Sequence, residues 1–221
     1  IVITKADVDG NKIDDTEDSA KATFVLSGSD LTGVTAGGQT DADNNGEIEF
    51  TGNEATIIGI KDGEYELEEK TAPNGYMTVS EFSFTITGGK VDNTGTQVLT
   101  DGAVKLEEGK IIVMDEKKFI TVSKRDLNAA SDTAVSATFK LTGTNLGGVE
   151  IGTDNALADD TTEVTFTGAD TIITGLTDGT YVLKETAGPD GYQVVSEFTF
   201  VIVDGKVDTN ETVTVTGGEV E

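Results

Sequence analysis

The sequence predicts an all-β fold of two tandem antiparallel β-sandwich domains arranged end to end. Three observations predict it: short runs rich in Val, Ile, Thr, Phe and Tyr alternate apolar with polar residues, glycine-containing turn pairs separate these runs, and the second half of the chain repeats the first. Alternation with a period of two is typical of strands that bury one face, and Asn-Gly or Asp-Gly pairs favour hairpin turns. Stretches of helical period are few, so a βαβ fold is not expected.

The repeat is clearest around a proline turn. Residues 65–76 (YELEEKTAPNGY) return as residues 181–192 (YVLKETAGPDGY). Two upstream segments, 3–7 and 22–26, return as 122–126 and 137–141 with slightly different offsets, which small loop insertions explain. We therefore predict one domain over residues 1–117 and a second over 118–221. The junction is so short that a semi-rigid linkage is expected.

The amino-acid composition excludes several classes of partner and of site chemistry. Asp plus Glu number 41 against 15 Lys plus Arg, a formal net charge of -26, which makes nucleic acid and anionic membranes poor partners. The chain has no Cys, His or Trp, so disulfides, thiolate or imidazole nucleophiles and Cys/His zinc sites are excluded. No run of about 20 apolar residues occurs, so membrane insertion of this segment is not expected. No cofactor is implied.

Charged residues occupy positions that the strand pattern assigns to the core. In the first expected strand, Lys5 shares a face with Ile1 and Ile3, and in the second repeat Lys124 continues the stripe of Ile120 and Val122. Each lysine therefore ends an apolar stripe. An isolated buried charge costs several kcal/mol, so these amines must be paired, neutralised or consumed by chemistry.

Carboxyl groups show the same pattern. Glu69 shares a face with Tyr65 and Leu67, and Glu185 repeats this arrangement. In the closing strand of the first repeat, Asp115 follows Ile111 and Val113 on one face. From the pattern alone, two structures explain these charges: a buried salt-bridge cluster, or strand ends that open into water.

These segments, in their order and spacing, resemble the collagen-adhesin B-type (CnaB) domain, an Ig-like or prealbumin-like sandwich. The resemblance rests on a lysine in the first strand, a Glu-x-x-x-Pro-x-Gly-Tyr signature after Glu69, and an Asp in the last strand. It implies an autocatalytic isopeptide bond between Lys5 and Asp115, with Glu69 as proton shuttle. Lys124 and Glu185 take the corresponding places in the second domain.

The family forms stalks of adhesins and shafts of pili on Gram-positive cells, so the resemblance implies an extracellular, cell-wall-anchored or pilus location and a structural role in cell adhesion. Neighbouring domains or subunits of the same surface polymer are the expected partners. A module that binds a host protein or glycan is the alternative. Enzymatic action on an external substrate is not expected, because bond formation is a single-turnover event.

The second repeat is expected to lack its closing strand. The repeat offset places its acceptor near position 231, beyond Glu221, so Lys124 and Glu185 should be left unpartnered. Asp208 and Asn210 match the loop after the first repeat's corresponding strand and are not taken as acceptors. Either the sequence simply stops here, or another chain donates the closing strand by β-augmentation.

One acidic segment resembles the start of a calcium loop. Asp41, Asp43 and Asn45 have the required spacing, but position twelve is Gly52 where a bidentate Glu belongs, and no helices are expected around it. We interpret the segment as a polar hairpin turn and predict no metal site, with these three residues as weak candidate ligands.

Overall fold

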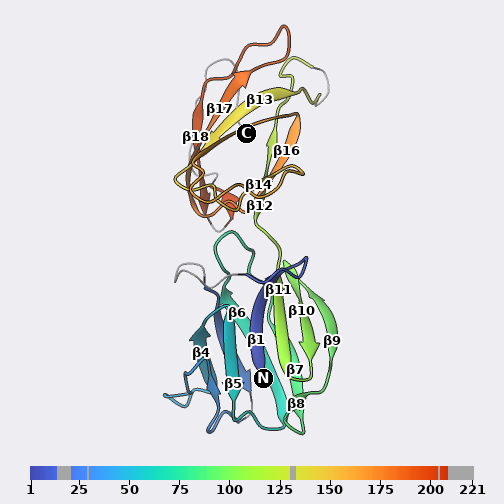
Figure 1. The fold of residues 1–221 in the computed structure, drawn as a ribbon, viewed down its shortest axis with the longest axis vertical. Helices are drawn as coiled ribbons and strands as arrows, with labels where there is room; N and C mark the ends of the chain where they lie inside the picture. The colour runs from blue at the N-terminus through green and yellow to red at the C-terminus, as the bar shows by residue number, and fades with distance from the viewer. Residues whose placement is uncertain (14–20, 29, 130–132, 204, 209–221) are drawn as a thin grey trace. The chain divides into compact units, whose positions relative to one another are not determined.

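The computed structural model describes the chain except for residues 14–20, 29, 130–132, 204 and 209–221 (Figure 1). The chain divides into two units, Ile1–Lys117 and Lys118–Glu221. The prediction of an all-β fold is confirmed, because every regular element among the described residues is a strand. In that part of the chain, no helix is long and apolar enough to cross a membrane.

The first unit is a sandwich of two sheets. The six-stranded sheet has the order β3 (Thr35–Ala36), β5 (Glu54–Ile58), β1 (Val2–Asp7), β11 (Lys110–Asp115), β10 (Gly102–Glu107) and β9 (Gly95–Leu99). The five-stranded sheet has the order β4 (Glu47–Thr51), β2 (Thr23–Gly28), β6 (Gly63–Thr71), β7 (Phe82–Thr87) and β8 (Lys90–Val91). Figure 1 shows β1 between β5 and β11.

Strand pairing in this unit is antiparallel with one exception among the described residues. The first strand, β1, and the last, β11, run parallel, with Lys5 in register with Val113 and Asp7 in register with Asp115. Such a parallel pair requires a crossover connection, which here is the rest of the domain. The prediction of antiparallel sheets therefore holds for the sandwich but not for this central pair.

The core lies between the two sheets and follows the predicted alternation. Ile3 and Ile111 from one sheet pack with Phe24, Leu67 and others from the opposite sheet in a single buried cluster. Close approach is built into this packing at Gly28, where an added Cβ would lie 2.4 Å from the ring of Tyr65. The Tyr65 ring in turn stacks on Phe84.

The second unit repeats this design. Its five-stranded sheet has the order β15 (Glu163–Gly168), β13 (Ala137–Thr142), β17 (Gly179–Ala187), β18 (Phe198–Val203) and β19 (Lys206–Val207). Its other sheet has three strands, β12 (Phe119–Ser123), β16 (Asp170–Thr174) and β14 (Glu150–Ile151). These eight strands correspond in order to β4, β2, β6, β7, β8, β1, β5 and β3. Among the described residues, β12 pairs only with β16, whereas β1 pairs on both sides.

The proline turn that carries the sequence signature has the same geometry in both units. In the first, the Tyr76 amide donates to the Pro73 carbonyl at 3.1 Å, and Gly75 has a φ of 81°. A positive φ at the third turn position is typical of a type II turn and favours glycine. In the second, the Tyr192 amide donates to the Pro189 carbonyl at 3.0 Å. The turn reverses the chain directly after the strand that carries the inward-facing glutamate.

Candidate functional site: a buried lysine and two carboxyl groups

Lys5 lies in the core of the first unit, as the sequence pattern predicts. It is on β1 two residues after Ile3, and its exposed fraction is 0%. Its Nζ lies 5.7 Å from the centre of the Phe24 ring, which belongs to the opposite sheet. The amine therefore sits against an aromatic face, away from water.

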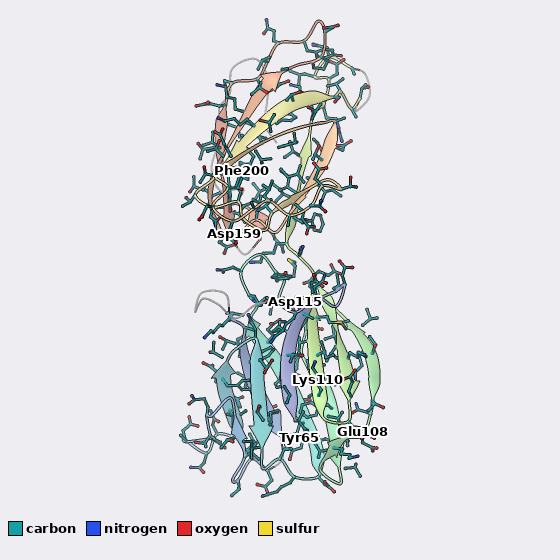
Figure 2. The ribbon with its side chains drawn as sticks, viewed as in Figure 1. Tyr65, Glu108, Lys110, Asp115, Asp159 and Phe200 are labelled. Atoms are coloured by element: carbon teal, nitrogen blue, oxygen red, sulfur yellow. The ribbon has the colours of Figure 1, made fainter. Side chains whose placement is uncertain are left out.

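Two carboxyl groups meet this amine. Asp115, at the end of β11, has an exposed fraction of 0%, and its Oδ1 accepts a hydrogen bond from Lys5 Nζ. Glu69, on β6 of the facing sheet, places Oε1 2.7 Å from the same Nζ. Figure 2 labels the two ends of β11, which begins at Lys110 and ends at Asp115. The structure thus brings together the three residues that the sequence places on core faces, from three strands far apart in the chain.

Burial dominates the electrostatics of the two acids. It raises the pKa of Asp115 to about 8, against the opposing effect of the Lys5 charge and with a further increase from the negative charge of Glu69. Burial likewise raises the pKa of Glu69, while the neighbouring Lys5 charge works to lower it. Both shifts reflect the cost of removing a carboxylate from water. Asp115 can therefore hold a proton at neutral pH.

Backbone support for Glu69 was missed by the sequence analysis. The Val79 amide donates to Glu69 Oε2 at 3.1 Å, which leaves Oε1 for the amine. In the second unit the Val195 amide donates to Glu185 Oε2 at 2.8 Å. The signal was present in the sequence, because a valine follows each glutamate by ten residues. Phe24 was also missed as a neighbour of the amine, although it lies in a repeated Ala-Thr-Phe segment.

The second unit holds a partial copy of the site. Lys124 Nζ lies 3.1 Å from Glu185 Oε2, and the Lys124 side chain is 13% exposed. The expectation that these two residues are left unpartnered is therefore wrong, because they pair with each other. In the part of the chain that the structure describes, Glu185 Oε1 is buried and no hydrogen-bond donor reaches it. Both groups that point to Glu185 use the other oxygen.

The sequence model of the SpaA prealbumin-like fold domain matches the chain twice, over residues 6–102 and 85–217. The chain belongs to the SpaA prealbumin-like fold domain family. The two matches confirm the predicted resemblance to tandem CnaB-type domains. No curated protein matches the chain.

Solved structures similar to the chain include pilus proteins of Lactobacillus rhamnosus GG and a protein of Bacillus anthracis. A C-terminal fragment of the pilus adhesin SpaC from Lactobacillus rhamnosus GG is 20% identical, with 99% of this chain and 86% of that chain covered and a TM-score of 0.44. The Bacillus anthracis TIE protein is 21% identical, with 91% and 31% covered and a TM-score of 0.38. The shaft pilin spaA from Lactobacillus rhamnosus GG is 13% identical, with 91% and 92% covered and a TM-score of 0.29. The match to the structure of SpaC in its open conformation covers only 28% of the SpaC chain.

The remaining candidates of the SpaA-type domains lie away from these sites. Asp41 accepts backbone hydrogen bonds from Asn45 and Gly46, and the Asn45 side chain accepts one from Glu47, so their oxygens close a turn. Among the described residues, no three His, Cys, Asp or Glu side chains are grouped to hold a metal ion. The Asp208 amide donates to the Val201 carbonyl, which ties Asp208 to β18. Asn210 lies outside the described residues.

Proposed function

We propose that this chain is a structural stalk segment of a Gram-positive surface adhesin or pilin, and that its first domain locks itself with an isopeptide bond between Lys5 and Asp115. The observation that carries the proposal is the contact of the Lys5 amine with two carboxyl groups at a point where neither Lys5 nor Asp115 has any exposed surface. A buried ion cluster alone is a weak source of stability, because desolvation offsets most of the attraction.

The chemistry requires no cofactor. With Asp115 protonated and Lys5 neutral, the Nζ lone pair attacks Asp115 Cγ and forms a tetrahedral intermediate. Glu69 accepts a proton from the nitrogen and delivers it to the departing hydroxyl, so that an amide forms and one water leaves. The raised pKa of Asp115 favours its protonated form at neutral pH. Transfer of a proton from the Lys5 ammonium to the Asp115 carboxylate leaves the net charge of the two groups unchanged.

The fold supplies the proximity that this reaction needs. Parallel pairing of β1 with β11 and the facing strand β6 hold the amine, the electrophilic carbon and the proton carrier in contact. A well-oriented intramolecular reaction can reach effective molarities of about 10⁵ M or more. The Val79 amide fixes one oxygen of Glu69, so the other stays directed at the amine. The event occurs once per domain and consumes no external substrate.

A stalk role fits the position of the bond. Lys5 and Asp115 are 110 residues apart, so a bond between them closes nearly the whole domain into one loop. The expected location is extracellular on the cell surface, and the expected partners are neighbouring domains or subunits of the same polymer. The absence of cysteine is compatible with such a role, because this cross-link needs no oxidant.

Intact-mass measurement of the denatured chain tests the proposal. The wild type is expected to be lighter than its calculated mass by one water, and Lys5→Ala and Glu69→Ala are each expected to have their full calculated mass. Lys12→Ala, which removes an exposed lysine, should keep the deficit. A wild-type chain of full mass would leave an ordinary buried ion cluster in place of the bond.

The second domain favours a second candidate function, capture of a strand. Lys124 and Glu185 correspond to Lys5 and Glu69 of the first domain, and Oε1 of Glu185 is buried and unsatisfied. Among the described residues β12 pairs only with β16, so the side of β12 that corresponds to the β11 side of β1 has no described partner strand. A strand aligned parallel to β12 would bring its acceptor carboxyl to Oε1 of Glu185, two residues beyond the position opposite Lys124. The strand would be supplied by a neighbouring subunit or by an added peptide.

A synthetic peptide with the sequence of residues 110–116 provides the test of capture. Incubation with the chain should give a covalent adduct whose cross-link maps to Lys124 by peptide mass spectrometry. Lys124→Ala should give no adduct, and Lys118→Ala should behave as the wild type. Absence of an adduct with the wild type would remove strand capture as a function without affecting the bond proposed for the first domain.

A further inference from the structure

The proline turn of the first domain binds the chain just beyond the acceptor strand. The Met77 amide donates to the Glu116 carbonyl at 2.8 Å. Tyr76 forms an antiparallel bridge with Lys117, and both turn residues are half-buried. The two residues that follow Asp115 are therefore held by the turn, in addition to the parallel pairing of β11 with β1.

The same turn in the second domain has no such partner among the described residues. Gln193 takes the place of Met77, and no described residue accepts a hydrogen bond from its amide. Gln193 is exposed, and the neighbouring Tyr192 is 40% exposed. Water can satisfy an exposed amide, so a free amide alone identifies no partner. The first domain identifies one, because there the equivalent amide binds the residue directly after the acceptor.

A side-chain hydrogen bond holds this turn beside the segment that carries the reactive lysine. The Tyr192 hydroxyl donates to Asp126 Oδ2 at 3.0 Å, and Asp126 lies two residues after Lys124. The turn is thus fixed relative to the end of β12, and the Gln193 amide has a defined position before any strand arrives. A group that is already in place loses less conformational entropy when a partner binds.

We propose that Tyr192 and Gln193 form a docking site for a captured strand, which recognises the backbone of the residues that follow its acceptor carboxyl. This site rests on the strand capture proposed above and adds a requirement to it. The closing strand of a neighbouring subunit runs parallel to β12, places its carboxyl beside Glu185, and accepts a hydrogen bond from the Gln193 amide through its next carbonyl. Backbone recognition gives affinity without requiring particular side chains. The acceptor must therefore lie inside its chain, with at least two residues after it.

Two capped peptides, with the sequences of residues 110–115 and 110–117, test the docking site on the full chain. Their net charges are equal, because Glu116 and Lys117 cancel. Asp115→Ala in both peptides prevents the cross-link, so fluorescence anisotropy of the labelled peptides measures docking alone. The longer peptide should bind about two- to tenfold more tightly, which is the usual net effect of one hydrogen bond.

Variants of the chain assign this difference to the turn. Gln193→Pro removes the amide hydrogen, so it should reduce the affinity of the longer peptide to that of the shorter one and leave the shorter one unchanged. Gln193→Ala keeps the amide and should bind both peptides as the wild type does. Tyr192→Phe releases the turn from Asp126 but keeps the amide, so it should weaken binding of the longer peptide by a smaller factor.

The outcomes separate the docking site from the covalent step. Equal affinities of the two peptides for the wild type, or a Gln193→Pro variant that keeps the difference, would overturn the docking site even if peptides with Asp115 form an adduct with Lys124. Tighter binding of the longer peptide without any such adduct would support the docking site and count against the covalent step. No binding of either peptide would overturn both.

Discussion

Lys5 on β1 stands opposite Val113 on β11, so its side chain reaches Asp115 diagonally, across two residues of the parallel pair. A lysine is long enough to span this offset, and the direction of the diagonal carries Nζ toward Glu69 on the facing sheet. A one-residue shift of register would turn Asp115 to the opposite face of the sheet. The contact therefore depends on the register of β1 with β11 as well as on the three residue types.

Loss of the bond should lower the stability of the first domain. Closure of a loop of about 110 residues is worth about 4 to 5 kcal/mol on the chain-entropy model used for disulfides. Glu69→Ala should therefore lose at least this amount, measured by urea denaturation followed by circular dichroism. Lys12→Ala should stay near the wild type. Equal unfolding midpoints of Glu69→Ala and the wild type would contradict the prediction.

Force applied to the two ends of the chain should show whether the first domain can lengthen. With the bond formed, the residues between Lys5 and Asp115 are shielded, so the first domain should not lengthen. Glu69→Ala should add an unfolding step of about 350 Å, the length of roughly 110 extended residues. Single-molecule force spectroscopy measures this step. Its presence in the wild type would argue against a closed loop.

The stability of a bond-free variant should fall as pH rises. In Lys5→Ala no bond can form, and the burial that raises the pKa of Asp115 is no longer opposed by the lysine. Between the unfolded pKa near 4 and the folded value, the folded state binds more protons than the unfolded state, so the free energy of unfolding decreases with pH. Denaturation at several pH values between 4 and 8 measures the slope.

General charge repulsion also changes over this pH range, so the matched control for that slope is the double variant Lys5→Ala, Asp115→Asn. It keeps the acidic surface and the buried Glu69 but removes the titrating carboxyl of Asp115. Its slope should be smaller, by up to about 1.4 kcal/mol per pH unit, the value for one proton. Identical slopes in the two variants would mean that Asp115 does not titrate in this range.

Gly28→Ala should destabilise the first domain without touching the bond. The new Cβ would lie 2.4 Å from the Tyr65 ring, which packs on Phe84 and donates its hydroxyl to the Lys61 carbonyl. Overpacking of this kind costs about 1 to 3 kcal/mol. Gly109→Ala meets no atom within 4 Å and is the control. Thermal unfolding should separate the two, while intact mass remains at the wild-type deficit.

The sequence predicted most of the fold and the three residues of the first site, because strand alternation is a local pattern that reports burial directly. Ile3, Lys5 and Leu67 all lie on the face that this pattern assigns. The pattern could not give the parallel pairing of β1 with β11, since partner choice depends on contacts between segments about 110 residues apart. The Lys124–Glu185 pair was missed for a related reason, because alternation gives the face of each residue but not its distance from another strand.

The parallel pairing of β1 with β11 also orders the events of folding. Contacts between distant segments form slowly, because the entropy of closing the intervening chain must be overcome before the contact contributes. Pairing of β1 with β11 is therefore expected late in folding. The pairs β2–β4 and β6–β7 join segments that are closer in sequence and can form earlier. An amine that meets its carboxyl only after this final docking reacts only in a completed domain, so the covalent bond would be a record that folding had finished.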